Sequence, residues 1–356
     1  MKRAELNIAG RRVGPGEPVL VIAEIGVNHD GSLERALELL EIAGRCGADA
    51  VKLQLFSATT LMHASSSFAT YQKDRVTDAD PASMLRRYEL STSEVERVVQ
   101  DIRRRNMIPI ATPFSPTDVD AIERLDLPAI KIASPDLVNR LLLRRAVRSG
   151  RPLLLSTGAA TMQEVCASVT WLEKTAPAFA LLHCISSYPT PTHLTNLSWI
   201  GELSAAYGYV VGYSDHATDV MSGALATACG ASLVEKHLTY DRSAPGPDHS
   251  SSADPAQFAD YVGLIRSASM MLGTPGKRVL DVEADVRRVS RQSLVLTCDV
   301  QAGDVLTDAH LTAQRPGSGI SAAELDDVIG ARVKSSLGRG TMLQWDHLER
   351  ERHDGA

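Results

Sequence analysis

Cysteine is scarce in this 356-residue chain and is arranged neither for disulfides nor for zinc. The five cysteines are odd in number, lie far apart and form no C-x-x-C pair, as is typical of reduced, mostly buried thiols. The first ten residues, MKRAELNIAG, contain no continuous apolar run of the kind that a secretory signal requires. No stretch approaches the ~18 apolar residues of a membrane helix. We therefore expect a cytoplasmic protein that does not associate with membranes.

A strong basic patch is also missing. The formal net charge is -6 at pH 7, and the short run Arg103-Arg104-Arg105 is most simply read as one solvated face of a helix. This argues against a nucleic-acid partner. A composition of 44% hydrophobic and 22% charged residues is ordinary for a globular protein with a substantial core.

From residue 19 onward, short apolar runs alternate with amphipathic segments. Eight runs predict strands, at residues 19–26, 50–55, 107–112, 129–134, 152–157, 179–184, 209–214 and 232–237. Helical periodicity is clear at residues 33–46, 93–105, 137–149, 219–229 and 255–272. Strands that are apolar on both faces and alternate with helices indicate a parallel sheet, and eight such units in about 255 residues predict a (β/α)8 (TIM) barrel. A doubly wound open sheet is the alternative, but IGVNHDG after the first strand is not a G-x-G-x-x-G fingerprint.

The periodicity ends near LGTPGKRVLD (272–281), where glycine and proline indicate a linker. We predict a barrel domain over residues 1–272, a linker over 273–290 and a small β-rich domain over 291–356, with AGD, PGSG and LGRG turns. The connection over residues 56–91 is unusually long. A loop of this length inside a domain is more often a lid or a binding segment than slack chain.

Polar residues close every predicted strand. They are Glu24, Lys52, Gln54, Thr112, Lys131, Ser134, Ser156, Thr157, His183, Ser214, Asp215, His216, Glu235, Lys236 and His237. In a TIM barrel the carboxyl ends of the strands carry the chemistry. A charged residue inside an apolar strand is costly unless it is paired or binds a ligand. One such residue alone could be a structural ion pair, but the whole set at one face predicts a site.

Two histidines, His216 and His237, end adjacent predicted strands and lie one repeat apart. Two imidazoles with open surroundings suit a divalent metal that keeps water or substrate as its other ligands. The alternative for each histidine alone is a hydrogen-bonded core residue.

Two lysines and several hydroxyls are available for a small, multiply charged anion such as a phosphate that carries a carboxylate. They are Lys52, Lys131, Ser134, Ser156 and Ser214. Glu24 and Asp248 then remain for hydroxyl binding or proton transfer. Ser214, Asp215 and His216 are not expected to form a hydrolytic triad, because side chains of consecutive strand residues point in opposite directions.

With these residues assembled, the chain resembles the N-acetylneuraminate (sialic acid) synthase family, the phosphoenolpyruvate-condensing synthases of nonulosonic acids. The matching stretches run in order along most of the chain: AEIGVNHDGS (23–32), VKLQLF (51–56), ATPFS (111–115), KIASPDL (131–137), LLLSTGAAT (153–161), LLHCISSYPTP (181–191), GYSDH (212–216), EKHLT (235–239), PGPDHS (245–250) and RPGSGI (315–320). The resemblance implies a TIM barrel followed by an antifreeze-like (SAF, β-clip) domain. It also implies a domain-swapped homodimer in which Arg315 reaches the acceptor sugar in the partner's barrel.

The resemblance further implies site roles. His216 and His237 match ligands of a divalent metal, usually Mn²⁺, with Mg²⁺ or Co²⁺ as alternatives. The implied phosphoenolpyruvate pocket comprises Lys52, Thr112, Lys131, Ser134, Ser156 and Ser214. The implied sugar and reaction residues are Glu24, Gln54, Tyr188 and Asp248, and we predict Glu24, Lys52, Lys131 and Asp248 to be catalytic. The implied reaction joins C3 of phosphoenolpyruvate to the aldehyde carbon of an open-chain N-acylated hexosamine.

Three positions depart from the family pattern and leave the acceptor sugar open. Asp136 stands where some members have glutamate, Ser186 stands where N-acetylneuraminate synthases have asparagine, and Leu53 replaces a histidine or phenylalanine near the substrate. Asp136 and Ser186 remain predicted substrate-binding residues. The acceptor is N-acetylmannosamine or a diacetamido-trideoxyhexose. Two other functions stay open: a non-catalytic sugar-binding or morphogenetic protein, and a metal-dependent aldolase that does not use phosphoenolpyruvate.

Overall fold

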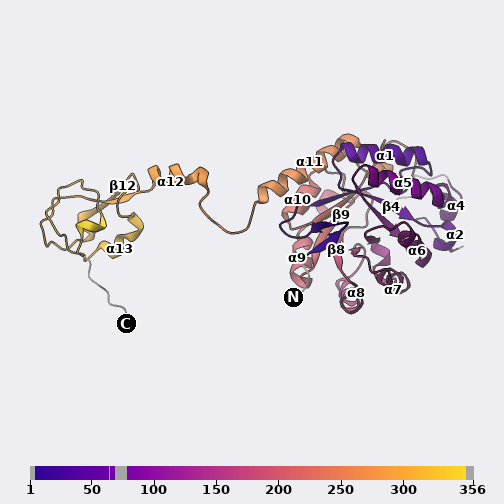
Figure 1. Ribbon diagram of the computed structural model, residues 1–356, viewed down its shortest axis with the longest axis horizontal. Coiled ribbons are helices and arrows are strands. Elements are labelled where there is room, and N and C mark those ends of the chain that lie inside the picture. The colour runs from indigo at the N-terminus through magenta and orange to yellow at the C-terminus, as the bar shows by residue number, and fades with distance from the viewer. Residues whose placement is uncertain (1–4, 64, 69–77, 350–356) are drawn as a thin grey trace. The chain divides into compact units, whose positions relative to one another are not determined.

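Eight parallel strands form a closed barrel, which confirms the predicted (β/α)8 architecture (Figure 1). The computed structural model describes residues 5–63, 65–68 and 78–349, and the chain divides into two compact units, Met1–Thr274 and Pro275–Ala356. The barrel strands are β3 (Leu20–Glu24), β4 (Ala50–Leu55), β5 (Ile108–Pro113), β6 (Ile130–Ile132), β7 (Leu153–Ser156), β8 (Phe179–Cys184), β9 (Val210–Asp215) and β10 (Leu233–His237). They pair in chain order, and β10 closes the barrel against β3.

The barrel interior is apolar at the end where the strands begin. One buried cluster joins inward side chains of several strands, such as Leu20, Ile110 and Leu154, to residues of an N-terminal hairpin. This hairpin pairs β1 (Leu6–Ile8) with β2 (Arg11–Val13). Its Ile8 is fully buried in the cluster. The hairpin therefore closes the amino-terminal end of the barrel, and the inward polar residues are left to the other end.

Amphipathic helices cover the outside of the barrel. They are α1 (Leu33–Arg45), α5 (Thr92–Arg104), α6 (Pro116–Arg124), α7 (Arg140–Arg148), α8 (Met162–Thr175), α9 (Ser198–Tyr207), α10 (Ser222–Ala228) and α11 (Pro255–Leu272). α5 shows why they form. Ser91 and Glu94 make a reciprocal capping box at its start, and the buried residues Val95, Val98 and Ile102 follow at helical spacing. In the described part of the chain, no helix has both the length and the apolar character that crossing a membrane requires.

The long connection after β4 folds in part into short helices. These are α2 (Ala58–Leu61) and α4 (Pro81–Arg87), and residues 64 and 69–77 of the predicted lid lie outside the described residues. Met84 and Tyr88 pack with Val27 in a small apolar cluster. α4 is thereby held against the loop that follows β3.

The second unit is small and rich in short extended segments. β11 (Ser293–Leu296) pairs antiparallel with β12 (Leu311–Gln314), and isolated bridges join several further segments. Its core includes Leu294, Leu306, Val333 and Leu343, all of them buried. Within the predicted linker, residues 284–290 form a helix, α12 (Ala284–Ser290), and α13 (Leu325–Val328) lies further along.

Candidate active site

A cavity of about 380 Å³ lies at the carboxyl ends of the barrel strands. The predicted site residues that line it are Lys52, Gln54, Thr112, Lys131, Ser134, Ser156, Ser186, Tyr188, Ser214, His216, His237 and Asp248. Strand alternation explains the inward set, because Lys52 and Gln54 share one face of β4 and Leu53 lies on the other. The fold thus brings together residues that are up to 196 positions apart in the chain, from Lys52 to Asp248.

Four buried charged side chains form a cluster, and three of them, Lys52, Lys131 and Glu235, line this cavity. The Nζ atom of Lys52 lies 2.5 Å from Oε2 of Glu24 and 3.0 Å from Oε1 of Glu235. The Nζ atom of Lys131 lies 3.9 Å from the same Glu235 oxygen. None of the four side chains is more than 5% exposed. Two positive and two negative charges cancel, so the cluster is formally neutral before any ligand binds.

The cluster shifts the pKa values of its own members. Burial lowers the pKa of Lys52 to about 8, although Glu235 favours its charged form. Burial also disfavours the Glu235 carboxylate, but the Lys131 and Lys52 ammonium groups outweigh it and lower the pKa of Glu235 to about 2. At neutral pH Glu235 is ionised and Lys52 is largely protonated.

Hydroxyl groups surround the lysines. Ser156 Oγ accepts a 2.6 Å hydrogen bond from Lys131 Nζ, and Ser214 Oγ donates to Glu235 Oε1 over 3.3 Å. Ser134 Oγ accepts the N–H of Gly158 at 3.1 Å. Thr112 Oγ1 is buried and has no hydrogen-bond partner in the described part of the protein. A buried hydroxyl that faces a cavity without a protein partner is available to a ligand or to an ordered water.

The two predicted metal ligands lie side by side. The ring centroids of His216 and His237 are 5.7 Å apart, and the ring of Tyr188 packs on His216 with a centroid distance of 4.0 Å. His216 Nδ1 donates to the carbonyl oxygen of Ile185 at 2.9 Å. This bond leaves the Nε2 lone pair of neutral His216 for a metal, as is usual for metal-binding histidines.

His237 also suits a metal ligand. Its Nδ1 is buried and makes no hydrogen bond to any described residue, and the nearest acidic atom is Oδ2 of Asp248 at 4.0 Å. Burial lowers the pKa of His237 well below its usual value, so the ring is neutral and can donate a lone pair. For His216, burial lowers the pKa, but negative charge on Cys184, the hydrogen bonds to Cys184 and to the Ile185 carbonyl, and the charge of Asp215 together outweigh burial and raise it.

The described residues contain no group of three or more histidine, cysteine, aspartate or glutamate side chains placed as a metal cage. The two imidazoles would supply two of the ligands of a divalent ion, and water or substrate would supply the others.

Three predicted site residues do not line the cavity. Glu24 is fully buried behind Lys52, and its Oε1 accepts the backbone N–H of Gly26. Asp136 lies in a 3-10 turn after β6, where Asn139 donates to its carboxylate and burial raises its pKa. Arg315 belongs to the second unit and is exposed directly after β12.

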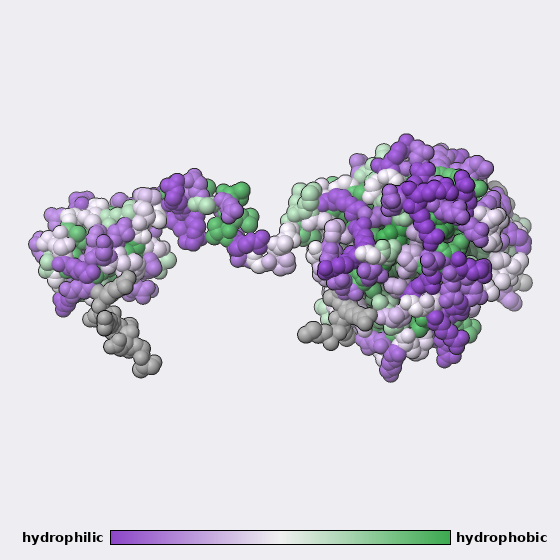
Figure 2. Space-filling view, in the orientation of Figure 1, coloured by the Kyte–Doolittle hydropathy of each residue, from purple (hydrophilic) through white to green (hydrophobic). Residues whose placement is uncertain are grey.

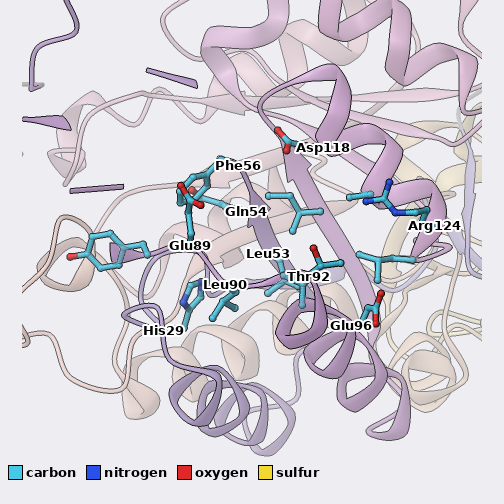
Figure 3. Close-up of a pocket in the computed structure, with 15 residues that line it drawn as sticks. His29, Leu53, Gln54, Phe56, Glu89, Leu90, Thr92, Glu96, Asp118 and Arg124 are labelled. Atoms are coloured by element: carbon cyan, nitrogen blue, oxygen red, sulfur yellow. The ribbon is translucent and has the colours of Figure 1, made fainter. Parts of the chain in front are cut away.

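A second, smaller cavity of about 130 Å³ lies on the outer side of β4 (Figure 3). Leu53 lines this outer cavity and not the central one, whereas Gln54 borders both. The expectation that Leu53 stands near the substrate therefore does not match its position. Arg124 and Glu96, on α6 and α5, lie at one side of this cavity, and His29 lies at the other (Figure 3).

The sequence places Glu235 in the strand-end polar set but assigns it no role, and it does not predict the apolar wall. Glu235 lines the cavity and contacts Lys52 and Ser214. The available signal was its inward position in the strand run LVEKH, two residues before His237. The apolar wall comprises Val27, Met84, Leu85, Phe114 and Pro247. Met84 and Leu85 come from α4, which no strand-end rule can locate.

Comparisons with known proteins indicate the same family along most of the chain. The model of the NeuB family matches residues 39–277, and that of the SAF domain matches residues 291–349. An N,N'-diacetyllegionaminic acid synthase of Legionella pneumophila is 34% identical over 94% of this chain and 96% of its own length. A synthase with the same name from Campylobacter jejuni is 33% identical over 87% of this chain and 94% of its own length. The crystal structure of N-acetylneuraminic acid synthetase from Leptospira borgpetersenii in complex with citrate superposes with a TM-score of 0.71 at 31% identity, covering 79% of this chain and 94% of that chain.

Proposed function

The chain belongs to the NeuB family, and from this membership and the geometry of the barrel mouth we propose that it is a carbon-carbon bond-forming synthase. It condenses phosphoenolpyruvate with the open-chain form of an N-acylated hexosamine, and the products are a nonulosonic acid and phosphate. Two relatives that are 33–34% identical, from Legionella pneumophila and Campylobacter jejuni, are named N,N'-diacetyllegionaminic acid synthases.

The observation that carries this proposal is the buried pair Lys52 and Lys131 beside unpartnered polar groups in one cavity. Phosphoenolpyruvate carries a phosphate and a carboxylate, and two ammonium groups with neighbouring hydroxyls suit both. Ser134, Ser156 and Ser214 come from three different strand ends around the same lysines. An aldolase that does not use phosphoenolpyruvate has no need for a second buried lysine at this place.

The reaction needs little covalent chemistry from the protein. C3 of phosphoenolpyruvate adds to the aldehyde carbon, a water oxygen adds to C2, and phosphate leaves with its bridging oxygen as the C–O bond breaks. Of the two protons of this water, one goes to the former aldehyde oxygen and the other goes to the departing phosphate as C2 becomes the keto carbon of the product. Lys52 and Lys131 hold the anion, and Asp248 faces the cavity beside His237 for proton exchange with the sugar. Glu24 acts through Lys52, because its carboxylate contacts that ammonium group and not the cavity.

Charge balance favours a metal ion at His216 and His237. Glu24 and Glu235 already neutralise both lysines, so a bound phosphoenolpyruvate leaves excess negative charge in a buried site. When bound, a divalent cation such as Mn²⁺ supplies that positive charge and Lewis-acid polarisation of the aldehyde oxygen. His216 and His237 would hold the ion, and Tyr188 fixes the plane of the His216 ring.

The apolar wall favours a diacetamido-trideoxyhexose over N-acetylmannosamine as the acceptor. Val27, Met84 and Leu85 line one part of the cavity. They suit the methyl group of a 6-deoxy sugar and a second acetamido methyl, whereas hydroxyl groups at the same positions would lose hydrogen bonds to water.

We also propose the domain-swapped homodimer. Apolar side chains at residues 279–289 are exposed on the single chain, namely Val279, Leu280, Val282, Val286 and Val289 (Figure 2). Such a run supports burial against a second copy. In that dimer Arg315 would bind the acceptor sugar in the partner's barrel.

The direct test is a phosphate-release assay. The full chain is incubated with Mn²⁺, phosphoenolpyruvate and either 2,4-diacetamido-2,4,6-trideoxymannose or N-acetylmannosamine, and the product is identified by mass spectrometry. We expect release with the trideoxy sugar and at least tenfold lower kcat/KM with N-acetylmannosamine. Lys131→Met is expected to abolish release, and Lys174→Met, at an exposed lysine of α8, is the matched control. Absence of phosphate release with every aldose refutes the proposed function.

A further inference from the structure

A second buried ion pair lies on the outer face of the barrel wall, directly behind the two histidines. The Nζ atom of Lys236 is 2.9 Å from Oδ2 of Asp215, and both residues are at most 2% exposed. They are cross-strand neighbours in the register of β9 and β10. Because side chains alternate along a strand, Asp215 and Lys236 point away from the cavity that His216 and His237 line.

The pair holds the backbone on the carboxyl side of His216. Asp215 Oδ1 accepts the N–H of Ala217 at 2.8 Å, and Lys236 Nζ donates to the carbonyl oxygen of Ala217 at 2.6 Å. Both polar groups of the residue next to His216 are therefore held by side chains on two different strands. These contacts fix the direction of the chain after β9 relative to β10. They thereby fix the position of the His216 Cα atom relative to the His237 Cα atom.

Other contacts keep the ion pair itself in place. Ser222 of α10 donates to Asp215 Oδ2, and Lys236 Nζ lies 4.8 Å from the ring centroid of Tyr261 on α11. The Asp215 carboxylate accepts from Ala217, Ser222 and Lys236, and these use three of the about four hydrogen bonds that a carboxylate can accept. The group is thus a rigid support and not a mobile charge.

We propose that Asp215 and Lys236 are positioning residues that set the separation and orientation of the two metal-binding imidazoles. This inference rests on the proposed metal role of His216 and His237. A purely stabilising role explains the arrangement less well, because a buried ion pair is often no more stable than an apolar pair of similar size. The double contact with Ala217 is what an apolar pair cannot reproduce.

The test compares metal affinity with protein stability in the full chain. Mn²⁺ binding is followed by the loss of the free-ion electron paramagnetic resonance signal, and stability is followed by thermal unfolding. Lys236→Met removes one partner and leaves a buried carboxylate. The double variant Asp215→Leu/Lys236→Met replaces the pair by apolar side chains and keeps the interior neutral, so it remains folded where the single variant loses stability.

We expect Mn²⁺ to bind about 10- to 100-fold more weakly to both variants, the typical effect of removing a group that orients a metal ligand. Phosphoenolpyruvate affinity at saturating Mn²⁺ is expected to stay within about twofold, because Lys52 and Lys131 are untouched. Asp49→Asn is the matched control. Asp49 precedes β4, at the opposite end of the barrel, accepts the N–H of Val21 at 2.8 Å and pairs with Arg266 at 2.6 Å.

A folded double variant that binds Mn²⁺ as tightly as the natural protein overturns the inference and leaves the proposed function intact. Equal loss of Mn²⁺ affinity in Asp49→Asn also overturns it, because the effect is then one of general stability. A natural protein that binds no Mn²⁺ overturns the inference together with the metal-dependent function.

Discussion

Replacing Glu235 with glutamine should destabilise the barrel and at the same time strengthen anion binding. The carboxylate lies 3.0 Å from Lys52 Nζ and 3.9 Å from Lys131 Nζ, and all three side chains are buried. Its pKa of about 2, against an ordinary value of 4.5, corresponds to about 3 kcal/mol of stability at pH 7. Removing one partner of a buried ion pair costs about 3–5 kcal/mol in general. The estimate from the pKa shift and the general cost of breaking a buried ion pair agree. We therefore expect the free energy of unfolding to fall by about 3 kcal/mol.

The pH dependence of this loss follows from its sign. Because folding lowers the pKa of Glu235, its contribution is complete above pH 4.5 and disappears as the pH falls through about 2. The stability difference between the natural protein and Glu235→Gln should therefore be constant from pH 8 to about pH 5 and shrink below that.

Anion affinity should move the other way. The substitution changes the formal charge of the cluster from zero to +1. Even at roughly 10 Å, a unit charge acting through an effective dielectric constant of about 20 contributes about 1.7 kcal/mol, which is more than tenfold in affinity. Inorganic phosphate should thus raise the melting temperature of the variant more than that of the natural protein.

The assay is urea and thermal unfolding of the full chain in a Trp345→Phe background, with and without phosphate. In that background the fluorescence reports on the barrel, where the remaining tryptophans Trp171 and Trp199 lie. Glu41→Gln is the control, since its 3.8 Å pair with Arg45 is exposed and worth less than about 1 kcal/mol. Equal stability of Glu235→Gln and the natural protein at pH 7, or unchanged phosphate affinity, would refute the account of a neutral, ligand-ready cluster.

Three further substitutions test other parts of the site. Burial lowers the pKa of Lys52 to about 8, so phosphoenolpyruvate affinity measured by calorimetry should fall above that pH by up to about tenfold per pH unit. Lys52→Arg keeps its charge and should make this affinity less dependent on pH. A methyl group at Gly158 would clash with the Oγ atoms of Ser186 and Ser134, so Gly158→Ala should raise the KM for phosphoenolpyruvate about tenfold or more. Gly263→Ala, at a helical glycine with open space around it, should leave KM unchanged. Arg315→Ala should raise the KM for the sugar at least tenfold with little change in that for phosphoenolpyruvate, and a protein that is monomeric by light scattering would contradict the proposed role of Arg315.

Much of the fold is readable from the sequence because apolar runs and helix caps are local signals. The predicted strands overlap the observed ones, and the differences are at their ends. The run predicted over residues 129–134 shortens to Ile130–Ile132, since the chain enters a 3-10 turn at Ser134, before Pro135. That turn also carries Asp136 away from the cavity. A strand-end rule places a residue at the barrel mouth but does not say where the following turn directs it.

The contacts inside the site needed the structure because they depend on register across the barrel. Alternation predicts that Glu235 and Lys52 both point inward. Only the closed barrel, in which β3 separates β10 from β4, shows that Glu235 reaches Lys52 across the intervening strand. Met84 was beyond reach for another reason. It lies on a short helix in a long connection, and the packing of such a helix on Val27 has no periodic signature in the sequence.

The stretch Ser214-Asp215-His216 shows how one strand end can serve chemistry and structure together. Ser214 and His216 face the cavity, and Asp215 faces the helices, where Lys236 and the backbone of Ala217 satisfy it. The same division holds on β10, with Lys236 between two inward residues. Holding the inward imidazoles of His216 and His237 in one orientation costs conformational entropy. The ion pair of Asp215 and Lys236 lies one residue away from each histidine, on the face of the barrel that the helices bury. Rigidity is therefore supplied from outside the barrel, which leaves the inner lone pairs of both histidines open to a ligand.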